Sequence, residues 1–429
     1  MTFFYKVQQY FYDGNLSSYI LQKLRLESNK QKLQKKILSA TTQENYIAQK
    51  KIYKLLRWEL KLIFFKKSAS IGNIIDILSE LIYQSNNSGV NKKKYEQYLN
   101  TFSLIPADTL SNNNWQMLGF ICNINGLFRL SGICRELGAS HTRKKYENNK
   151  SIFNLLAMFR LEFDSGNYDR AEKLLAEAQQ NSKSNYIKDL HDKFYNYKNI
   201  NDRQKILNKN QEAFQKQILN KNIVIIAPGL ININQEVIDE VNSFDLIIFF
   251  NYKGNKIHKD FNLPFMSYYN SEAALVLRDS FDSFSNDLEF SVFKKISNKA
   301  QKILVNKMKG KTLDKDLDRL FFVQQPNLLQ LLLDDLLPYR TNRIKVLGSN
   351  FYLNEKKYFD GYISDNKPNE THTDMWRAFA FHNILSQVNF IRNLHKTGRI
   401  ELDQACLDVI NMDESELLNA YELIYSKFE

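Results

Sequence analysis

Short apolar segments alternate with longer amphipathic segments throughout the second half of this chain. Each apolar segment is four to six residues long, which suits a strand buried on both faces of a parallel sheet. Strands that alternate with helices in this way predict a doubly wound sheet whose two faces are covered by helices. The segments lie at residues 223–228, 245–250, 264–269, 302–305, 319–324 and 344–347.

The first half of the chain shows no such alternation and has the pattern of packed helices. Two of its segments resemble halves of tetratricopeptide repeats, in which small residues let paired helices approach closely and large ones fill the space between them. The first carries Trp115, Leu118, Gly119 and Cys122, followed by Gly126 and Phe128; the second carries Gly166, Tyr168, Ala171, Leu175 and Ala178.

These patterns together predict an α/β protein. Its doubly wound, mainly parallel, Rossmann-like sheet domain is preceded by an all-helical N-terminal domain. We place a basic helical segment at residues 1–107 and a helical-hairpin region at 108–200. A polar linker follows at 201–221, and the sheet domain occupies 222–429.

Basic residues are concentrated near the N-terminus. Residues 1–100 hold 17 Lys and Arg against 7 Asp and Glu, whereas residues 201–429 hold 29 against 30. Residues 43–67 place Lys and Arg beside Trp and Phe at helical spacing, which suits an anionic membrane surface or a helix packed within its own domain. No recognised nucleic-acid-binding motif accompanies this charge, so we expect no nucleic-acid partner.

The cysteines and the lengths of the apolar runs indicate the cellular compartment of the protein. Cys122, Cys134 and Cys406 are too few and too scattered for a disulfide scaffold or a zinc site. The N-terminus lacks the pattern of a secretory signal, and no apolar run approaches the roughly 18 residues of a membrane span. We therefore expect a cytoplasmic protein whose attachment to a membrane, if any, is peripheral.

Polar residues and glycines follow several of the predicted strands, at the edge of the sheet where ligands bind in folds of this kind. Asn251 and Asn270 directly follow the second and third strands. An Asn side chain offers a donor and an acceptor to a base or a sugar, although at a strand end it also serves as a plain turn former. The turn at Gly229 is too short for a dinucleotide fingerprint.

Two tyrosines and a histidine follow Gly348, which ends the last predicted strand. Tyr352 and Tyr358, six residues apart, offer neutral hydroxyl donors that can hold a leaving phosphate, although loop tyrosines also commonly pack on a domain surface. His382 lies near the start of a predicted helix, where it can act as a general base on a hydroxyl group. The alternative acid–base pair is His372 with Asp374.

One acidic run, residues 314–318, has the sequence DKDLD and can be compared with an Asp-x-Asp metal motif. It lies among charged residues and before a predicted strand instead of after one. We therefore expect a solvated loop there and no metal site.

The segment from residue 343 onward resembles bacterial lipooligosaccharide sialyltransferases of glycosyltransferase family 42. The similarity extends over about residues 222–403. In that family a strand runs into Ser-Gly-Ile-Asp-Phe-Tyr with a second Tyr six residues later, and here residues 347–352 read Leu-Gly-Ser-Asn-Phe-Tyr before Tyr358. The family's catalytic His opens the pattern H-x11-L-x-K-T-x2-I-x-L. Counted from His382, that pattern falls on Leu394, Lys396, Thr397, Ile400 and Leu402.

This resemblance implies transfer of a sialic acid or a related 2-keto acid sugar, a nonulosonate or Kdo, from its CMP donor to a bacterial surface glycan. It implies an inverting reaction in lipopolysaccharide or capsule synthesis, with His382 as base, Tyr352 and Tyr358 on the donor phosphate, and neither metal nor cofactor. The acceptor would be lipid-linked, at the inner face of the inner membrane. Residues expected to bind the donor nucleotide or sugar are Gly229, Asn251, Asn270, Ser271, Gly348, Ser349 and Asn350.

Two features depart from the family and leave other functions open. The first turn, Ala-Pro-Gly-Leu at 227–230, lacks the family's donor-contacting Asn, and residues 324–327 replace its Thr-Ser-Gly. One alternative is a metal-dependent transferase that uses a nucleotide-diphosphate sugar. Another is a non-catalytic helical-repeat scaffold with a degenerate nucleotide fold.

Overall fold

The computed structural model describes residues 89–198, 209–230, 233–252, 261–269, 285–294, 312–315, 327–353 and 383–425, with scattered positions between 73 and 84. The basic helix predicted at 43–67 and the strands predicted at 302–305 and 319–324 lie outside these residues.

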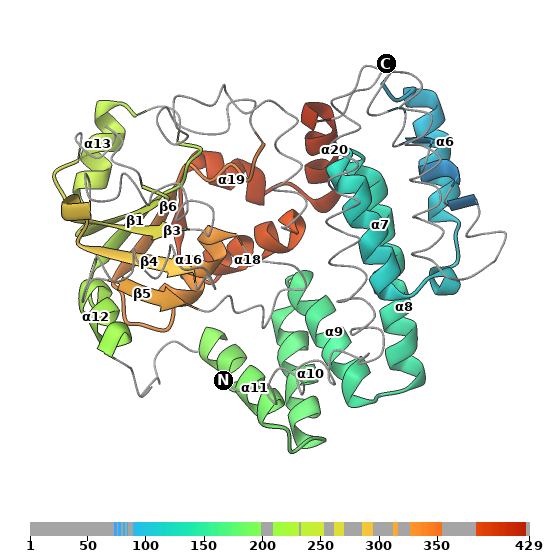
Figure 1. The fold of residues 1–429 in the computed structure, drawn as a ribbon, viewed down its shortest axis with the longest axis horizontal. Coiled ribbons are helices and arrows are strands. Elements are labelled where there is room, and N and C mark those ends of the chain that lie inside the picture. Colours follow the sequence, from blue (N-terminus) through green and yellow to red (C-terminus); the bar gives the residue numbers. More distant parts are fainter. Residues whose placement is uncertain are drawn as a thin grey trace.

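A seven-stranded sheet in which every neighbouring pair is parallel forms one half of the molecule (Figure 1). Its strand order is β5-β4-β3-β2-β1-β6-β7, which confirms the predicted α/β class and parallel sheet. The strands are β1 (Asn222–Ile226), β2 (Leu246–Phe250), β3 (Phe265–Tyr269), β4 (Phe290–Lys294), β5 (Thr312–Lys315), β6 (Arg343–Leu347) and β7 (Glu401–Leu402).

The prediction of a solvated loop over the acidic run 314–318 is wrong for its first two residues. Asp314 and Lys315 form the end of β5, which is the edge strand of the sheet. Edge strands often carry charged residues, since one side of the strand has no neighbour to pair with. The sequence pattern also missed β4, which contains Ser291 and Lys294, and β7, which is only two residues long.

Helices account for most of the remaining described residues. In chain order they are α6 (Lys92–Ser103), α7 (Asn112–Ile124), α8 (Phe128–Asn148), α9 (Ile152–Asp164), α10 (Tyr168–Gln180), α11 (Asn185–Lys198), α12 (Lys209–Ile218), α13 (Gln235–Asn242), α16 (Leu328–Leu336), α18 (Ile384–Lys396), α19 (Gln404–Ile410) and α20 (Glu414–Tyr425). Short 3-10 turns lie at η2 (Ala107–Thr109) and η7 (Ser285–Asp287). None of these helices combines the length and the apolar content needed to cross a bilayer.

Two antiparallel helical hairpins, α7–α8 and α9–α10, occupy the region expected to resemble tetratricopeptide repeats (Figure 1). Each hairpin turns at a glycine in the left-handed conformation, Gly126 at φ +76° and Gly166 at φ +80°. A side chain at Gly138 of α8 would lie 3.2 Å from Cβ of Trp115 on α7, so the glycine allows these two helices to touch. Both segments therefore form paired helices.

Alternation along the central strands creates two separate apolar layers. In β1, Ile223 and Ile225 belong to one buried cluster, whereas Val224 and Ile226 belong to another. The second cluster includes Val241 of α13. Because successive side chains of a strand point to opposite faces, a strand covered on both sides must be apolar throughout.

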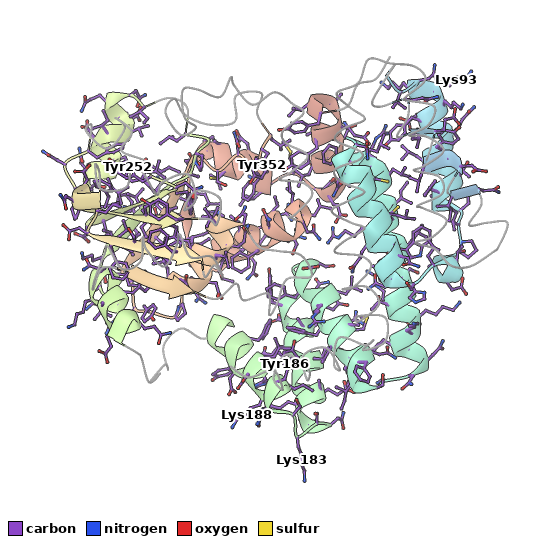
Figure 2. The ribbon with its side chains drawn as sticks, in the orientation of Figure 1. Lys93, Lys183, Tyr186, Lys188, Tyr252 and Tyr352 are labelled. Carbon is purple, nitrogen blue, oxygen red and sulfur yellow. The ribbon has the colours of Figure 1, made fainter. Side chains whose placement is uncertain are left out.

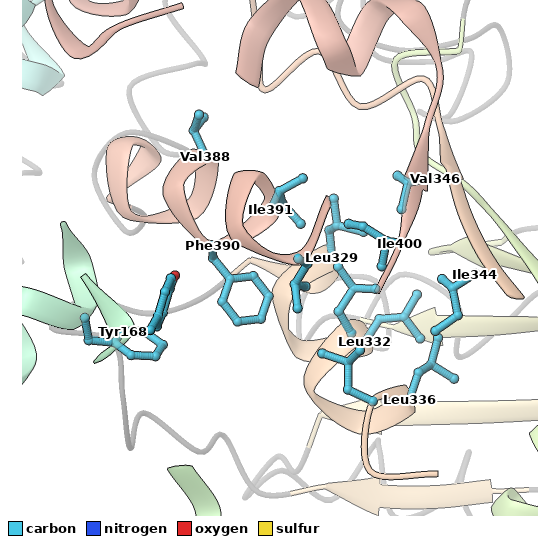
Figure 3. Close-up of a cluster of buried hydrophobic side chains, with 14 of the residues drawn as sticks. Tyr168, Leu329, Leu332, Leu336, Ile344, Val346, Val388, Phe390, Ile391 and Ile400 are labelled. Atoms are coloured by element: carbon cyan, nitrogen blue, oxygen red, sulfur yellow. The ribbon is translucent and has the colours of Figure 1, made fainter. Parts of the chain in front are cut away.

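The larger cluster lies between the sheet and the helices α16 and α18. Figure 3 shows Leu332 and Leu336 of α16 and Ile391 of α18 packed around Ile344 and Val346 of β6. Each such buried side chain contributes about 1.5–3 kcal/mol relative to an exposed one. The same cluster continues into the helical hairpins, so one core connects the two halves of the molecule.

The C-terminal helix α20 packs against the helical hairpins although it follows the sheet in sequence. Its Tyr421 ring lies 5.3 Å from the Phe128 ring at the start of α8, measured between centroids. A side chain at Gly132 would lie 2.5 Å from Leu418, so α8 and α20 are in direct contact. The final helix of the region predicted as the sheet domain is therefore attached to the helical-hairpin region.

Candidate functional site

The strand order reverses between β1 and β6. The chain adds β2 to β5 on one side of β1 and then crosses to place β6 and β7 on the other side. In parallel α/β sheets, ligands bind in the crevice beyond the carboxyl ends of the two strands at such a reversal. Here that edge is formed by the turn Ala227–Leu230 after β1 and by residues 348–353 after β6, which we call the β6 turn.

The two turns touch each other. Ala227 N donates a hydrogen bond of 2.9 Å to Leu347 O. A Cβ atom on Gly229 would lie 2.5 Å from Gly348 O and 3.0 Å from Asn350 Nδ2. A Cβ atom on Gly348, at φ +72°, would lie 2.4 Å from Leu230 N. Both positions therefore require glycine, and three of the predicted donor-binding residues, Gly229, Gly348 and Asn350, lie together.

Asp403 fixes the β6 turn from the segment after β7. Its Oδ2 accepts a 2.6 Å hydrogen bond from Gly348 N. Its Oδ1 accepts a 3.0 Å hydrogen bond from Cys406 N and so caps helix α19. Asp403 was not among the predicted site residues, although an Asp directly before a helical stretch is the usual signal of an N-cap.

The β6 turn holds two consecutive non-glycine residues in the left-handed conformation, Phe351 at φ 50° and Tyr352 at φ 72°. Such a pair is rare, and each residue costs about 1–3 kcal/mol. Asn350 stabilises the turn, since its Oδ1 accepts from Tyr352 N at 3.0 Å and its backbone O accepts from Leu353 N at 2.9 Å. Backbone strain of this kind clusters at binding and catalytic sites.

The amide nitrogen of Asn350 is a donor that the described residues leave unused. Nδ2 is buried and has no hydrogen-bond partner among them. Most buried side-chain donors are satisfied, because a lost hydrogen bond to water costs about 1–3 kcal/mol. The side chain of Asn350 therefore holds a buried, unpartnered donor beside Gly229, where the turns after β1 and β6 meet.

Tyr352 is a partly buried residue in the same turn (Figure 2). Burial raises the pKa of its hydroxyl to about 12, because the phenolate would lose its hydration. The group therefore stays protonated at neutral pH and can donate a hydrogen bond to an anionic oxygen. Ser349 lies next to Gly348 in this turn and is also partly buried.

Asn251 extends the edge toward β2. Its backbone is left-handed, at φ 50°, and the residue is 8% exposed. Asn251 N donates a 2.8 Å hydrogen bond to Tyr268 O, which fixes the turn directly after β2. Because β2 pairs with β1 in parallel register, Asn251 and the turn after β1 lie at the same edge of the sheet.

Helix α18 begins at the N-cap Asn383, whose Oδ1 accepts a 3.2 Å hydrogen bond from Ser386 N. The candidate base His382 directly precedes this cap in sequence. His382 itself lies outside the described residues. Five other predicted site residues also lie outside the described residues: Asn270, Ser271, Tyr358, His372 and Asp374.

A cavity of about 700 Å³ lies elsewhere, between the α9–α10 turn and the end of α18. Nothing in the sequence pattern pointed to it. Its lining mixes polar and apolar groups and includes no residue of the β1 or β6 turns. The lining residues are Gly166, Asn167, Tyr168, Asp169, Arg170, Phe194, Asn393, Leu394, Thr397 and Arg399.

No group of three or more His, Cys, Asp or Glu side chains among the described residues is arranged to hold a metal ion. Asp316 and Asp318 of the acidic run lie outside those residues.

Comparisons of this chain with protein families, with curated proteins and with solved structures find no match. The resemblance to the sialyltransferase family therefore stays a prediction that rests on the motifs at 347–358 and 382–402.

Proposed function

We propose that this protein is a glycosyltransferase that moves a sialic acid or a related 2-keto acid sugar from its CMP donor to a bacterial surface glycan. One observation carries the proposal. The turn whose sequence resembles the family, Leu-Gly-Ser-Asn-Phe-Tyr at 347–352, lies at the strand-order reversal and touches the turn after β1. That is the place where a Rossmann-like sheet binds nucleotides.

The proposed chemistry needs an acid–base group and donors for a departing phosphate. His382 would take the proton from the acceptor hydroxyl as the sugar is attacked from the face opposite CMP, which inverts the anomeric centre. Tyr352 and Tyr358 would donate hydrogen bonds to the phosphate oxygens of CMP, whose negative charge grows in the transition state. The raised pKa of Tyr352 supports its part, because only the protonated hydroxyl can donate.

Asn350 offers a replacement for the donor-contacting Asn that the first turn lacks. Its unpartnered Nδ2 lies beside Gly229. Gly229 belongs to the first turn, which is the turn that carries the donor-contacting Asn in the family. We propose that this amide donates to the nucleotide or to the sugar carboxylate. A donor reaching in from the β6 turn would fit a related 2-keto acid sugar as well as sialic acid.

A thermal-shift screen with CMP, UDP, GDP and their sugars tests the proposal directly. A ligand at 100 times its dissociation constant adds about 2.7 kcal/mol to stability. CMP and a CMP-sugar should raise the melting temperature most. A preference for UDP or GDP would contradict the assignment.

A transfer assay then tests the base. His382→Ala should lower turnover by about 10²–10⁴-fold and leave CMP binding intact, since a general base acts on the acceptor and not on the nucleotide. His372→Ala serves as the matched control. Wild-type turnover in His382→Ala together with loss in His372→Ala would transfer the role to His372.

The metal-dependent alternative fits the strand order less well. Asp314 lies on β5, four strands from β1, and four strand spacings are about 19 Å. A metal held there would be far from a nucleotide bound between the β1 and β6 turns. Loss of transfer on addition of EDTA, restored by a divalent cation, would favour this alternative.

The scaffold alternative is favoured by the helical hairpins, which the structure contains, and by the missing Asn of the first turn. It predicts CMP binding without turnover for any CMP-sugar and acceptor. Hydrolysis of a CMP-sugar by wild-type protein, absent in His382→Ala, would rule it out.

A further inference from the structure

Two tyrosines of the C-terminal helix α20 bind the backbone of the strained β6 turn. Tyr421 Oη donates a 2.6 Å hydrogen bond to Phe351 O, and Tyr425 Oη donates a 2.5 Å hydrogen bond to Tyr352 O. Phe351 and Tyr352 are the two residues in the left-handed conformation. Each carbonyl of the unfavourable pair is therefore bound by a hydroxyl from α20.

The two hydroxyls are well placed to fix the backbone. The rings of Tyr421 and Tyr425 stack with centroids 6.4 Å apart, one helical turn from each other. The Phe128 ring lies 5.3 Å from Tyr421 and 6.1 Å from Tyr425, so both are packed against the start of α8. Burial raises the pKa of both hydroxyls, which keeps them protonated and able to donate.

Glu422, the residue after Tyr421, attaches α20 to the helical hairpins. It is 1% exposed, and its carboxylate accepts hydrogen bonds from Arg129 N at 2.7 Å, from Arg129 Nε at 2.5 Å and from Tyr95 Oη. Arg129 N belongs to the first turn of α8, where helix N–H groups lack partners within the helix. The carboxylate accepts from one of these N–H groups, and its negative charge interacts favourably with the positive end of the helix dipole.

We propose that Tyr421 and Tyr425 are positioning residues. They hold the β6 turn in the shape that presents Asn350 and Tyr352, and Glu422 makes that shape depend on the helical-hairpin region. The helical hairpins are then part of the binding unit instead of a separate module. The link from this turn to a CMP phosphate rests on the proposed function, whereas the bracing of the turn does not.

Hydrogen exchange of the backbone amides tests, without any ligand, whether Tyr421 and Tyr425 brace the β6 turn. Tyr421→Phe and Tyr425→Phe each delete one hydroxyl and keep the ring. Losing one neutral hydrogen bond should raise exchange about five- to tenfold in peptides covering residues 348–353, and the double variant should raise it further. Glu422→Gln should raise exchange both in this turn and at the start of α8.

Tyr186→Phe is the matched control. Its hydroxyl is also buried and accepts a 3.1 Å hydrogen bond from Arg160 Nη2, far from the β6 turn. It should leave exchange at 348–353 unchanged. Unchanged exchange in the turn for the double variant, or an equal increase across the sheet, would overturn the brace and indicate only general destabilisation.

Calorimetric titration with CMP then tests the positioning role. The double variant should bind CMP about five- to tenfold more weakly, while Tyr186→Phe binds like wild type. Equal affinity of wild type and double variant, with faster exchange in the turn, would overturn the positioning role. If wild-type protein does not bind CMP at all, the proposed function fails, and the exchange data alone decide the brace.

Discussion

Replacing Asp164 by Asn should change the stability of this protein by an amount that grows as the pH rises. Asp164 ends helix α9 and is 6% exposed, in the contact between the helical hairpins and α18. Its Oδ1 accepts a 2.6 Å hydrogen bond from Ser386 Oγ, and its backbone O accepts a 2.9 Å hydrogen bond from Asn389 Nδ2. The side chain thus joins the first turns of α18 to the repeat-like region.

Burial raises the pKa of Asp164 from 3.8 to about 6, although Ser386, Arg135 and Arg160 favour the charged form. Between these two values the folded protein binds more protons than the unfolded chain. Stability is therefore lost as the pH rises from about 4 to about 6, and the loss is complete above that range. At about 1.4 kcal/mol for each pH unit between the two values, the ionised carboxylate costs about 3 kcal/mol at neutral pH.

Asparagine removes this cost, because it has no charge to bury and its Oδ1 can still accept from Ser386. Its Nδ2 needs a new acceptor, and an unsatisfied buried donor costs about 1–3 kcal/mol at every pH. The absolute change at one pH is therefore a sum of two opposed effects. The change with pH isolates the ionisation: from pH 4 to pH 8, Asp164→Asn should gain about 2–3 kcal/mol relative to wild type.

Urea denaturation of wild type and Asp164→Asn at several pH values between 4 and 8 measures this difference. Glu147→Gln, which removes one carboxylate from the exposed end of α8, controls for the loss of a negative charge. A difference between Asp164→Asn and wild type that stays constant across this pH range would refute the reasoning. It would mean that Asp164 titrates alike in the folded and unfolded chains.

Three further predictions concern the site and the N-terminal segment. Gly229→Ala should destabilise the protein by about 1–3 kcal/mol and abolish CMP binding, since the new Cβ meets Gly348 O at 2.5 Å; an unchanged melting temperature would contradict the contact. Tyr352→Phe should slow transfer by about 10–100-fold, which corresponds to the loss of one charge-assisted hydrogen bond, and an unchanged rate would mean that Tyr352 only packs. In the wild-type protein, ionisation of Tyr352 should cause no loss of rate between pH 7 and 10, because its pKa is raised to about 12. Deleting residues 1–100, which carry 17 Lys and Arg against 7 Asp and Glu, should abolish salt-sensitive co-sedimentation with anionic vesicles, and absence of pelleting by the full chain at low salt would end the membrane hypothesis.

The central strands could be predicted from the sequence because both of their faces are buried. Ile223 to Ile226 and Leu246 to Phe250 are apolar at every position, which is unusual outside a covered parallel strand. The strands toward β5 could not be predicted in the same way. Ser and Lys interrupt β4, and charged residues end β5, since pairing within the sheet and not an apolar run holds these segments as strands.

The part of the candidate site that depends on residues next to a strand end could be predicted from the sequence. Gly229, Gly348, Asn350 and Tyr352 follow β1 and β6 directly, and strand ends are where such sheets bind ligands. The residues that hold the β6 turn gave no such signal. Asp403 lies 55 residues beyond Gly348, and Tyr421 lies 70 residues beyond Phe351, so their pairing appears only in three dimensions.

The sequence by itself determined the strands β1, β2, β3 and β6, the residues that follow them and the paired helices of the two hairpins, because burial and turn geometry act on neighbours in the chain. The tertiary structure alone decided that β6 inserts beside β1, which brings Gly348 against the turn of Gly229. It also decided that α20 returns to the helical hairpins, with Tyr421 on the strained turn and Glu422 on α8. These contacts join residues far apart in sequence, and they form only when the sheet order and the packing of the helices are fixed together.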